Sequence, residues 1–260
     1  MRKGRLILIG TLLGLHTGFA FQDSDLDGVE DSVDKCPNTP ILELVDRYGC
    51  PLESKLGPRG KFYLRVGGSY TKDREEERAF SLISVAFSYG KLYTSFSTRY
   101  YLSSKLYPSG MGDSRLFVGY SGFIRDRMYT LAGIRFKIPT GSKYYSNGKV
   151  DFTPSVLVDY IMNRYDLFTS LSYTFRGDNE LKNTFSISLG GGYEFTEKLY
   201  GSLSLDLSQS ALNNSRYNTY LSMFALYDIT RNLYTSVTYS AGLNRRATDH
   251  SLSVRLGIRF

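Results

Sequence analysis

From residue 61 to the C-terminus, apolar and polar residues alternate with a period of two. The last segment shows the pattern most clearly, because Leu252, Val254, Leu256, Ile258 and Phe260 are separated by serine, arginine and glycine residues. Such alternation predicts a β-strand with one apolar face and one polar face. Twelve segments follow this pattern, at 61–71, 79–89, 91–102, 113–124, 128–138, 149–161, 165–175, 183–195, 198–209, 217–229, 232–243 and 250–260.

The connections between these segments alternate in length. Short connections at 90, 125–127, 162–164, 196–197 and 230–231 alternate with longer polar links at 72–78, 103–112, 139–148, 176–182, 210–216 and 244–249. An even number of strands, with short turns on one side and long loops on the other, is typical of an outer-membrane barrel. We therefore predict an all-β fold, with residues 61–260 forming a twelve-stranded antiparallel transmembrane barrel.

A soluble β-sandwich is the alternative fold for these segments. It would bury its apolar faces in one core with shorter strands, and it would not account for the aromatic residues near segment ends. These residues, which suit the two interfaces of a membrane, are Tyr70, Tyr89, Tyr100, Tyr160, Tyr193, Tyr227 and Phe260. In lipid every backbone polar group needs a partner, and a closed barrel provides one.

If the apolar residues face lipid, the other parity defines the lumen. The main candidate lumen residues are Arg65, Arg99, Arg115, Arg135, Asp151, Asp206 and Arg255. The same parity adds Lys61, Ser69, Lys137, Asp159, Asp166, Glu194, Asp228, Arg259 and the tyrosines Tyr63, Tyr93, Tyr101 and Tyr200. The parity of segment 217–229 stays open, because Phe224 and Leu226 would also face inward. The predicted lumen is basic on one wall and acidic on the other.

Two arrangements of these charges are compatible with the sequence. In one, the opposite charges pair across a narrow interior and fill it, because a twelve-stranded barrel is only modestly wider than one that side chains can fill. In the other, water keeps the walls apart, and the transverse field selects dipolar or charged solutes.

Residues 1–20 have the features of a secretory signal peptide. Arg2, Lys3 and Arg5 form a basic start, an apolar run follows, and small residues precede position 21. The run is short for a membrane anchor, which is the alternative interpretation. Export makes a disulfide between Cys36 and Cys50 permissible.

The first segment after this leader has the spacing of a calcium-binding loop. Asp23, Asp25, Asp27, Asp31 and Asp34 fall at loop positions 1, 3, 5, 9 and 12, and the carbonyl of Val29 falls at position 7. A hard cation takes six to eight oxygen ligands, and one short loop supplies them here. A solvated acidic linker is the alternative, but carboxylates this close would repel one another without a cation. We therefore expect calcium as a cofactor.

The segment continues Lys-Cys-Pro-Asn-Thr-Pro at 35–40 and ends Val-Asp-Arg-Tyr-Gly-Cys-Pro at 45–51. Residues 23–51 resemble a thrombospondin type 3 repeat, as found in periplasmic linkers of outer-membrane-protein-A-like proteins. The resemblance implies that the two cysteines pair and that the aspartates bind calcium in the periplasm. It assigns residues 21–51 to one repeat, followed by a linker at 52–60.

Two motifs in the barrel resemble those of outer-membrane proteins of phenol-degradation pathways. They are Ile-Pro-Thr-Gly at 138–141 and Asp-Phe-Thr-Pro at 151–154. The resemblance implies a channel for small aromatic or apolar compounds. The terminal Phe260 resembles the C-terminal assembly signal of bacterial outer-membrane proteins.

Composition and motifs exclude several function classes. The formal net charge is +7, but three of the basic residues lie in the leader and the others form no dense run, so nucleic acid is not an expected partner. After the leader the only histidine is His250, whose parity places it on the lipid face, away from Asp249 and Ser251. A catalytic base needs an orienting partner and a nucleophile within reach, so we do not expect an enzyme.

The sequence therefore predicts an outer-membrane channel or uptake pore for small solutes, in contact with outer-membrane lipid. The alternative is a structural or adhesive barrel with no transport role.

Overall fold

The computed structural model describes residues 29, 32–36, 47–48, 50, 60–74, 76–211, 217–245 and 247–260. The chain forms two compact units, Met1–Arg59 and Gly60–Phe260. The predicted leader, the residues 52–59 of the linker and the candidate calcium ligands Asp23, Asp25, Asp27 and Asp31 lie outside the described residues.

The described part of the chain contains thirteen strands and no helix. They are β1 (Lys61–Lys72), β2 (Glu77–Tyr89), β3 (Leu92–Ser104), β4 (Gly110–Met111), β5 (Ser114–Arg125), β6 (Met128–Ile138), β7 (Asp151–Met162), β8 (Tyr165–Thr174), β9 (Thr184–Thr196), β10 (Leu199–Gln209), β11 (Tyr217–Asp228), β12 (Leu233–Gly242) and β13 (His250–Arg259). The twelve long strands match the twelve predicted segments, with bounds that differ by no more than two residues. Among the described residues, no helix is long and apolar enough to cross a membrane.

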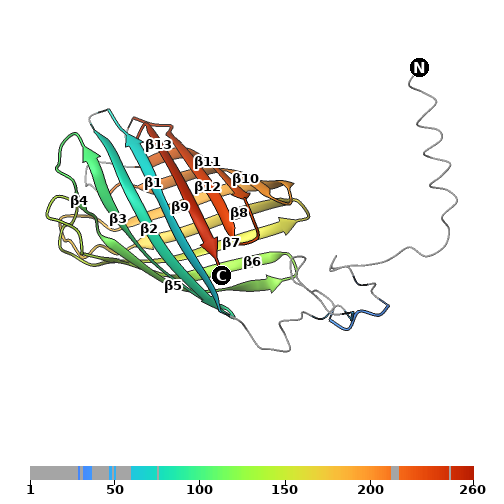
Figure 1. Cartoon of the computed structure of the whole chain (residues 1–260). Helices are drawn as coiled ribbons and strands as arrows, with labels where there is room; N and C mark the ends of the chain where they lie inside the picture. Colours follow the sequence, from blue (N-terminus) through green and yellow to red (C-terminus); the bar gives the residue numbers. More distant parts are fainter. Residues whose placement is uncertain are drawn as a thin grey trace, which may run out of the picture. The chain divides into compact units, whose positions relative to one another are not determined.

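The twelve long strands form a closed antiparallel barrel (Figure 1). Each strand pairs with its neighbour in the chain, and β1 closes the ring by pairing with β13 from Tyr63–Arg259 to Lys72–His250. At this seam the amide of Phe260 donates to the carbonyl of Phe62 at 2.9 Å, so the last residue of the chain is fixed to the first strand. The predicted fold class is confirmed, and closure leaves no unpaired strand edge in lipid.

The short strand β4 lies within a segment that the sequence predicts to be a loop. Its residues Gly110 and Met111 pair with Tyr101 and Tyr100 of β3. The amide of Gly112 also donates to the carbonyl of Arg99 at 2.9 Å, so the chain before β5 continues the ladder beside β3. Two residues are too few to show an alternating pattern in the sequence, so this pairing could not be predicted from it.

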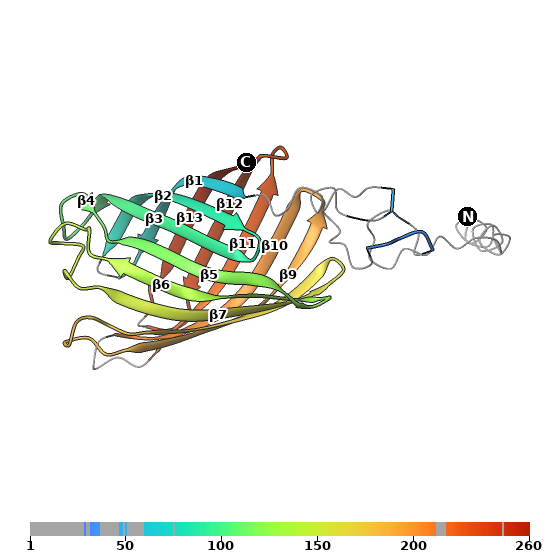
Figure 2. The ribbon, with the colours of Figure 1, turned by 90° about the horizontal axis from the view of Figure 1, so that it is seen from below.

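The two ends of the barrel differ in the length of their connections. Long connections, including the one that carries β4, emerge together at one end, which we call the loop end (Figure 2). The other end, which we call the turn end, holds the short connections and the C-terminal residue. Gly90 and Asn163 begin two of these turns with a φ of 55°, the left-handed conformation that two-residue hairpin turns require. Short turns face the periplasm in outer-membrane barrels.

Apolar side chains cover the outer face of the barrel. On β13 the side chains of Leu252, Val254 and Leu256 are exposed, and the polar residues between them face the other way. Exposed aromatic residues near strand ends, as predicted for the two membrane interfaces, include Tyr70, Tyr89, Tyr100, Tyr160, Tyr227 and Phe260. This surface would be unfavourable in water and is favourable in lipid.

The described residues of the first unit are held together by a disulfide. Cys36 and Cys50 are joined, as the resemblance to a thrombospondin type 3 repeat implies. Beside it the amide of Lys35 donates to the carbonyl of Tyr48 at 2.8 Å, and the Lys35 ammonium lies 3.9 Å from the centre of the Tyr48 ring. Among the candidate calcium ligands, Asp34 accepts a hydrogen bond from the amide of Cys36 at 2.8 Å through Oδ1.

Candidate functional site

The strand registers place the predicted lumen residues on the inner face. Arg65 lies opposite Ser84, Ser84 opposite Ser97, and Ser97 opposite Arg115. Directly opposite residues of neighbouring strands point to the same side of a sheet. Because the other side carries the exposed apolar residues, this row faces the lumen.

Five arginines occupy this inner face on β13, β1, β3, β5 and β6. They are Arg255, Arg65, Arg99, Arg115 and Arg135. Within residues 60–74, 76–211, 217–245 and 247–260, none of the five forms an ion pair with a carboxylate. The basic wall predicted from parity therefore holds no counter-ion from the described strands and loops.

A cavity of about 560 Å³ lies in front of this wall. Its charged lining consists of Arg65, Arg115, Arg135 and Arg255. Serines from β2, β3, β7 and β8 make up much of the rest of the surface. Hydroxyl groups and guanidinium groups both donate hydrogen bonds, so the cavity presents mainly donors to a solute.

Two aromatic rings line the same cavity. Tyr93 of β3 and Phe117 of β5 face each other with ring centres 6.0 Å apart. Phe117 is only 8% exposed, and its ring lies against Gly119 and Gly133, where a Cβ atom would come within 2.8 Å of it. Tyr93 was predicted to face the lumen, but Phe117 was not, although Phe117 has the parity of Arg115.

Arg65 is held in place by a tyrosine from two strands away. The Nε of Arg65 donates to the hydroxyl of Tyr234 on β12 at 2.8 Å. Between them lies Gly257 of β13, where a Cβ atom would be 2.2 Å from Cζ of Tyr234. Tyr234 is 7% exposed and was not predicted to be a lumen residue.

A second contact of Tyr234 lies at the turn end. The guanidinium of Arg259 is 5.0 Å from the centre of the Tyr234 ring, which is within the range of a cation–π interaction. Arg259 also forms an ion pair with Asp228 of β11. Asp228 lies opposite Tyr234, so both face the lumen, and Phe224 and Leu226 share that face. Asp228 therefore faces the lumen, which decides the parity of β11 that the sequence left open.

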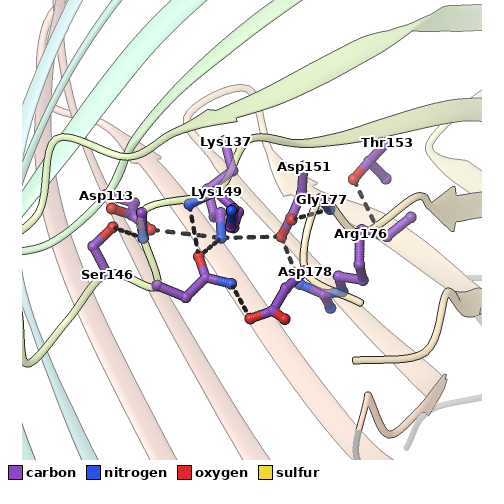
Figure 3. Close-up of polar contacts among 12 residues, drawn as sticks. Asp113, Lys137, Ser146, Lys149, Asp151, Thr153, Arg176, Gly177 and Asp178 are labelled. Carbon is purple, nitrogen blue, oxygen red and sulfur yellow. Dashed lines mark hydrogen bonds and ion pairs between the residues drawn. The ribbon is translucent and has the colours of Figure 1, made fainter. Parts of the chain in front are cut away.

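Asp151 lies at the loop end in a network of polar contacts (Figure 3). It is 2% exposed and accepts hydrogen bonds from Arg176 at 2.9 Å and the amide of Gly177 at 3.0 Å, while Lys137 lies 3.1 Å away. Lys137 and Asp151 were predicted to face the lumen from their parity. Arg176 was not predicted, because it lies beyond the end of its strand. Lys137 and Arg176 at the rim thus neutralise the charge of Asp151. Asp151 is therefore not a free carboxylate that faces the arginine wall.

The same network fastens two long connections to each other. The ammonium of Lys137 donates to the side-chain oxygen of Asn147 at 2.8 Å, and the side-chain nitrogen of Asn147 donates to the carboxylate of Asp178 at 3.0 Å. The backbone amide of Glu180 and the Asn147 side chain hold the pKa of Asp178 below its ordinary value. These contacts anchor the connections after β6 and β8 at the rim (Figure 3).

Asp206 is surrounded by hydroxyl groups. Ser222 of β11 donates to it at 2.5 Å, Ser204 of β10 at 3.2 Å, and Ser188 of β9 also donates to it. The predicted acidic residue of the opposite wall is therefore satisfied by its neighbours rather than by an arginine.

Near the turn end, two glycines make room for lumenal rings. A Cβ atom on Gly190 would be 2.3 Å from the Phe168 ring, and one on Gly192 would be 2.0 Å from the hydroxyl of Tyr200. Tyr200 was predicted to narrow the lumen, and it lies beside Asp166 over Gly192. Gly190 and Gly192 of the triple glycine at 190–192 therefore accommodate these side chains.

A second cavity, of about 360 Å³, lies at the loop end. Its lining is rich in tyrosine and comprises Arg78, Tyr101, Tyr107, Tyr144, Tyr145, Ser146 and Asn147. Tyr145 stacks on Tyr101 with ring centres 3.8 Å apart, and its hydroxyl donates to the carbonyl of Pro108 at 2.9 Å. The connection after β6 is therefore packed onto β3 and the segment around β4.

His250 lies on the outer face, as its parity predicts. Its Nδ1 is 2.8 Å from the hydroxyl of Tyr239, and among the described residues its side chain forms no hydrogen bond with Asp249 or Ser251. This is a contact between two strands at the lipid interface rather than an arrangement of base and nucleophile.

The charges of the lumen follow neither predicted arrangement throughout. The ion pairs Lys137–Asp151 and Arg259–Asp228 form between nearby strands at the two rims. Between the rims, the five arginines of the basic wall form no ion pair with a described residue. Ion pairs therefore form at the two ends, and between them both the arginine wall and Asp206 on the opposite wall lack an ion pair with a described residue.

A closed barrel with an apolar outer face and a charged interior defines a protein of the bacterial outer membrane with a porin-like fold. The family model described as putative MetA-pathway of phenol degradation matches residues 53–260. The chain belongs to this family.

Comparison with known proteins gives the same class. Outer membrane porin F of Pseudomonas aeruginosa is 38% identical over 76 residues, which is 29% of this chain and 21% of that protein. An outer membrane channel from Pseudomonas putida F1 superposes with a TM-score of 0.61 at 12% identity, over 77% of this chain and 94% of that one. The NanC porin superposes with a TM-score of 0.58 at 13% identity, over 76% and 98%. The match to porin F spans about a fifth of that relative.

Proposed function

We propose that this protein is an outer-membrane channel for small solutes that prefers anions. The observation that carries the proposal is the wall formed by Arg65, Arg99, Arg115, Arg135 and Arg255, which has no ion pair within the described barrel. Rings or walls of basic side chains attract anions and repel cations at short range. Low-dielectric walls strengthen this field compared with bulk water.

The distribution of the acidic residues supports the same preference. Asp151 and Asp228 are neutralised by Lys137, Arg176 and Arg259 at the rims, and Asp206 is bound by serine hydroxyls. An entering anion therefore meets few unpaired carboxylates before it reaches the arginines. Asp159, Asp166 and Glu194 near the turn end are the exceptions, since none of them forms an ion pair with a described residue. Asp159 and Asp166 each also have a buried oxygen without a hydrogen-bond partner among the described residues.

Similar barrels support passage of solutes through this fold. The neighbours include porins and a channel, and one superposable structure is the KdgM porin in complex with oligogalacturonate, with a TM-score of 0.53 at 11% identity over 77% of this chain. That ligand belongs to KdgM. For this chain the solute class is inferred from its own arginine wall.

The proposal includes a calcium-binding repeat on the periplasmic side. Its support is the spacing of the five aspartates at 23–34 and the disulfide that closes the segment behind them. A cation bound there would order a short segment of the unit that precedes the barrel in the sequence.

Conductance in a planar bilayer tests the proposed function. The purified protein is inserted in a bilayer between two different KCl concentrations, and the reversal potential is measured. We expect discrete conductance steps and a reversal potential with the sign of chloride preference. A barrel that is folded, as judged by heat-dependent migration on a gel, but shows no conductance would favour the structural or adhesive alternative. Cation preference would contradict the assignment of the arginine wall.

A further inference from the structure

The geometry points to a binding site in the lumen for a small organic dianion with two carboxylates on a flat ring. The site is the cavity of about 560 Å³, and the inference rests on the proposed channel function. Its basis is that four arginines reach this cavity as two pairs from separate parts of the wall, with aromatic rings beside them.

The first pair lies at the closing seam of the barrel. Arg65 is opposite Gly257, and Arg255 is opposite Gly67, so the two arginines are diagonal neighbours, two residues apart along the ladder. Tyr234 binds Nε of Arg65, and the guanidinium group of Arg65 lines the cavity together with Tyr93. The Nε of Arg255 is buried and has no hydrogen-bond partner among the described residues.

The second pair lies on β5 and β6. Arg115 is opposite Lys137, and Arg135 is two residues from Lys137 on the same strand. Lys137 binds Asp151 and Asn147 at the rim, which removes it from the cavity. Arg115 and Arg135 are thus a second diagonal pair of guanidinium groups, and neither forms an ion pair with a carboxylate of the described chain.

The distance between the pairs suits a ligand with two anionic ends. Arg65 and Arg115 lie in one row, separated by Ser84 and Ser97, so they are three strand spacings apart. Three spacings correspond to roughly 14 Å between their Cα atoms along the curved wall. Arginine side chains extend from both positions into the cavity, so a small dianion can contact both pairs. A monoanion would satisfy one pair and leave the other without a counter-ion.

Like charges held this close repel one another, and a bound carboxylate relieves that repulsion. A guanidinium group binds a carboxylate through two parallel hydrogen bonds, which is stronger than a single neutral bond. The serines of the row, Ser84 and Ser97, add hydroxyl donors between the two pairs. The ligand class is therefore set by positions of donors rather than by total charge alone.

The rings determine the shape of the middle of the ligand. Tyr93 and Phe117 line the cavity with their centres 6.0 Å apart. Aromatic rings pack on flat apolar groups in offset or edge-on arrangements. Cavities of 300–1,000 Å³ hold molecules of small-ligand size, and this one lies in that range with room for water beside a single benzene ring.

Terephthalate is the probe that tests this inference. Its ability to reduce the KCl current through single channels is compared with that of benzoate, succinate, inorganic phosphate and uncharged terephthalamide. We expect half-maximal block by terephthalate at a concentration about tenfold lower than for benzoate, since a second charge-assisted contact adds about 1.4 kcal/mol or more. Succinate has both carboxylates but no ring to pack beside Tyr93 and Phe117, so it should block less well than terephthalate. Terephthalamide should not block.

Variants locate the site. Arg115→Gln with Arg135→Gln should raise the blocking concentration of terephthalate about tenfold, to that of benzoate, and change the value for benzoate little. Arg115→Lys with Arg135→Lys keeps the charge but loses the paired hydrogen bonds, and it should give an intermediate value. Arg164→Gln with Arg231→Gln, two exposed residues in short turns, is the matched control and should change neither.

Each contrary result has a separate meaning. Equal block by terephthalate and benzoate, or by phosphate and terephthalate, would overturn the dianion site while leaving anion preference intact. If the glutamine pair leaves terephthalate block unchanged, the site does not lie at Arg115 and Arg135. If the wild-type barrel does not conduct, the proposed function fails, and calorimetric titration of the detergent-solubilised protein with terephthalate decides the binding site independently.

Discussion

The hydroxyl of Tyr234 accepts a hydrogen bond from Nε of Arg65 at 2.8 Å, over the space that Gly257 leaves by having no side chain. Three strands thus contribute to one contact: β12 provides the ring, β13 the gap and β1 the guanidinium. The guanidinium of Arg259 lies 5.0 Å from the centre of the same ring. Tyr234 fixes the direction in which Arg65 faces the lumen, and orientation is what makes a basic wall selective.

Removal of the Tyr234 hydroxyl should lower stability and loosen Arg65. Tyr234→Phe is expected to lower the free energy of unfolding by about 1.5–3 kcal/mol, because a hydrogen bond to a charged group in a buried site is lost. Urea unfolding in detergent, followed by heat-dependent migration on a gel, measures the change. The matched control is Tyr239→Phe on the outer face, which loses a bond to His250 and should lower stability by about 1 kcal/mol or less. Equal losses in the two variants would contradict the special role of Tyr234.

A side chain at position 257 should displace the Tyr234 ring. A Cβ atom there would lie 2.2 Å from Cζ of Tyr234, so Gly257→Ala is expected to destabilise the barrel by about 1–3 kcal/mol through overpacking. In Gly68→Ala, on the neighbouring strand, the nearest atom to the new Cβ is the carbonyl oxygen of Phe80 at 3.9 Å, and stability should be nearly unchanged. The same unfolding assay compares both. A Gly257→Ala barrel as stable as Gly68→Ala would show that Tyr234 is free to move.

The strands could be predicted closely from the sequence, and the reason is the membrane. Lipid on one side and water on the other require strict alternation, as on β13, where Leu252, Val254 and Leu256 face lipid. Arg65 and Arg255 could then be predicted to face the lumen from their own positions in this alternation. The ion pairs and hydrogen bonds of these charged residues could not be predicted from the sequence, because they depend on which residues lie opposite one another across several strands.

The residues that were missed show this limit. Tyr234, near the start of its strand, resembles an interfacial aromatic residue in sequence, and only the register places it over Gly257. Phe117 shares the parity of Arg115, but an apolar residue at a polar position looks like an exception to the alternation and was not assigned to the lumen. Arg176 follows the end of β8, where alternation no longer applies, and binds Asp151 from the loop.

The stability that the Glu76 carboxylate contributes at the rim should depend on pH. A hydrogen bond from Arg78, together with one from Ser104 at 2.9 Å, holds the pKa of Glu76 below its ordinary value of 4.5. A group with a lowered folded-state pKa contributes stability above its unfolded pKa, and loses it as the pH falls through the folded value. Glu76→Gln should therefore lower Tm by a constant amount above about pH 5 and by progressively less below pH 4.5.

Thermal unfolding of wild type and Glu76→Gln across pH 3–7 measures that difference. Glu180→Gln, in another loop, serves as the control for removing one carboxylate. A Tm difference that persists unchanged to the lowest pH would show that the Glu76 carboxylate is not stabilised by Arg78.

Calcium should protect the N-terminal repeat from proteolysis. With calcium bound, residues 22–51 should resist a protease that cleaves them in the presence of a chelator, because the cation joins five carboxylates in one loop. Asp25→Ala with Asp27→Ala should abolish the protection. The Cys36–Cys50 disulfide serves as an internal reference, since it stays intact in both states. Equal cleavage with and without calcium would count against the calcium site.

The central claim is that the unpaired arginines set the selectivity of the lumen. The most direct test is the reversal potential of Arg65→Glu with Arg255→Glu in a planar bilayer under a KCl gradient, with folding verified by heat-dependent migration. The exposed pair Arg164→Glu with Arg231→Glu changes the net charge equally and is the control. We predict that the lumenal pair abolishes or reverses chloride preference while the control pair retains it. A folded lumenal variant with the wild-type reversal potential would contradict the account, because these side chains would then not face the path of the ions.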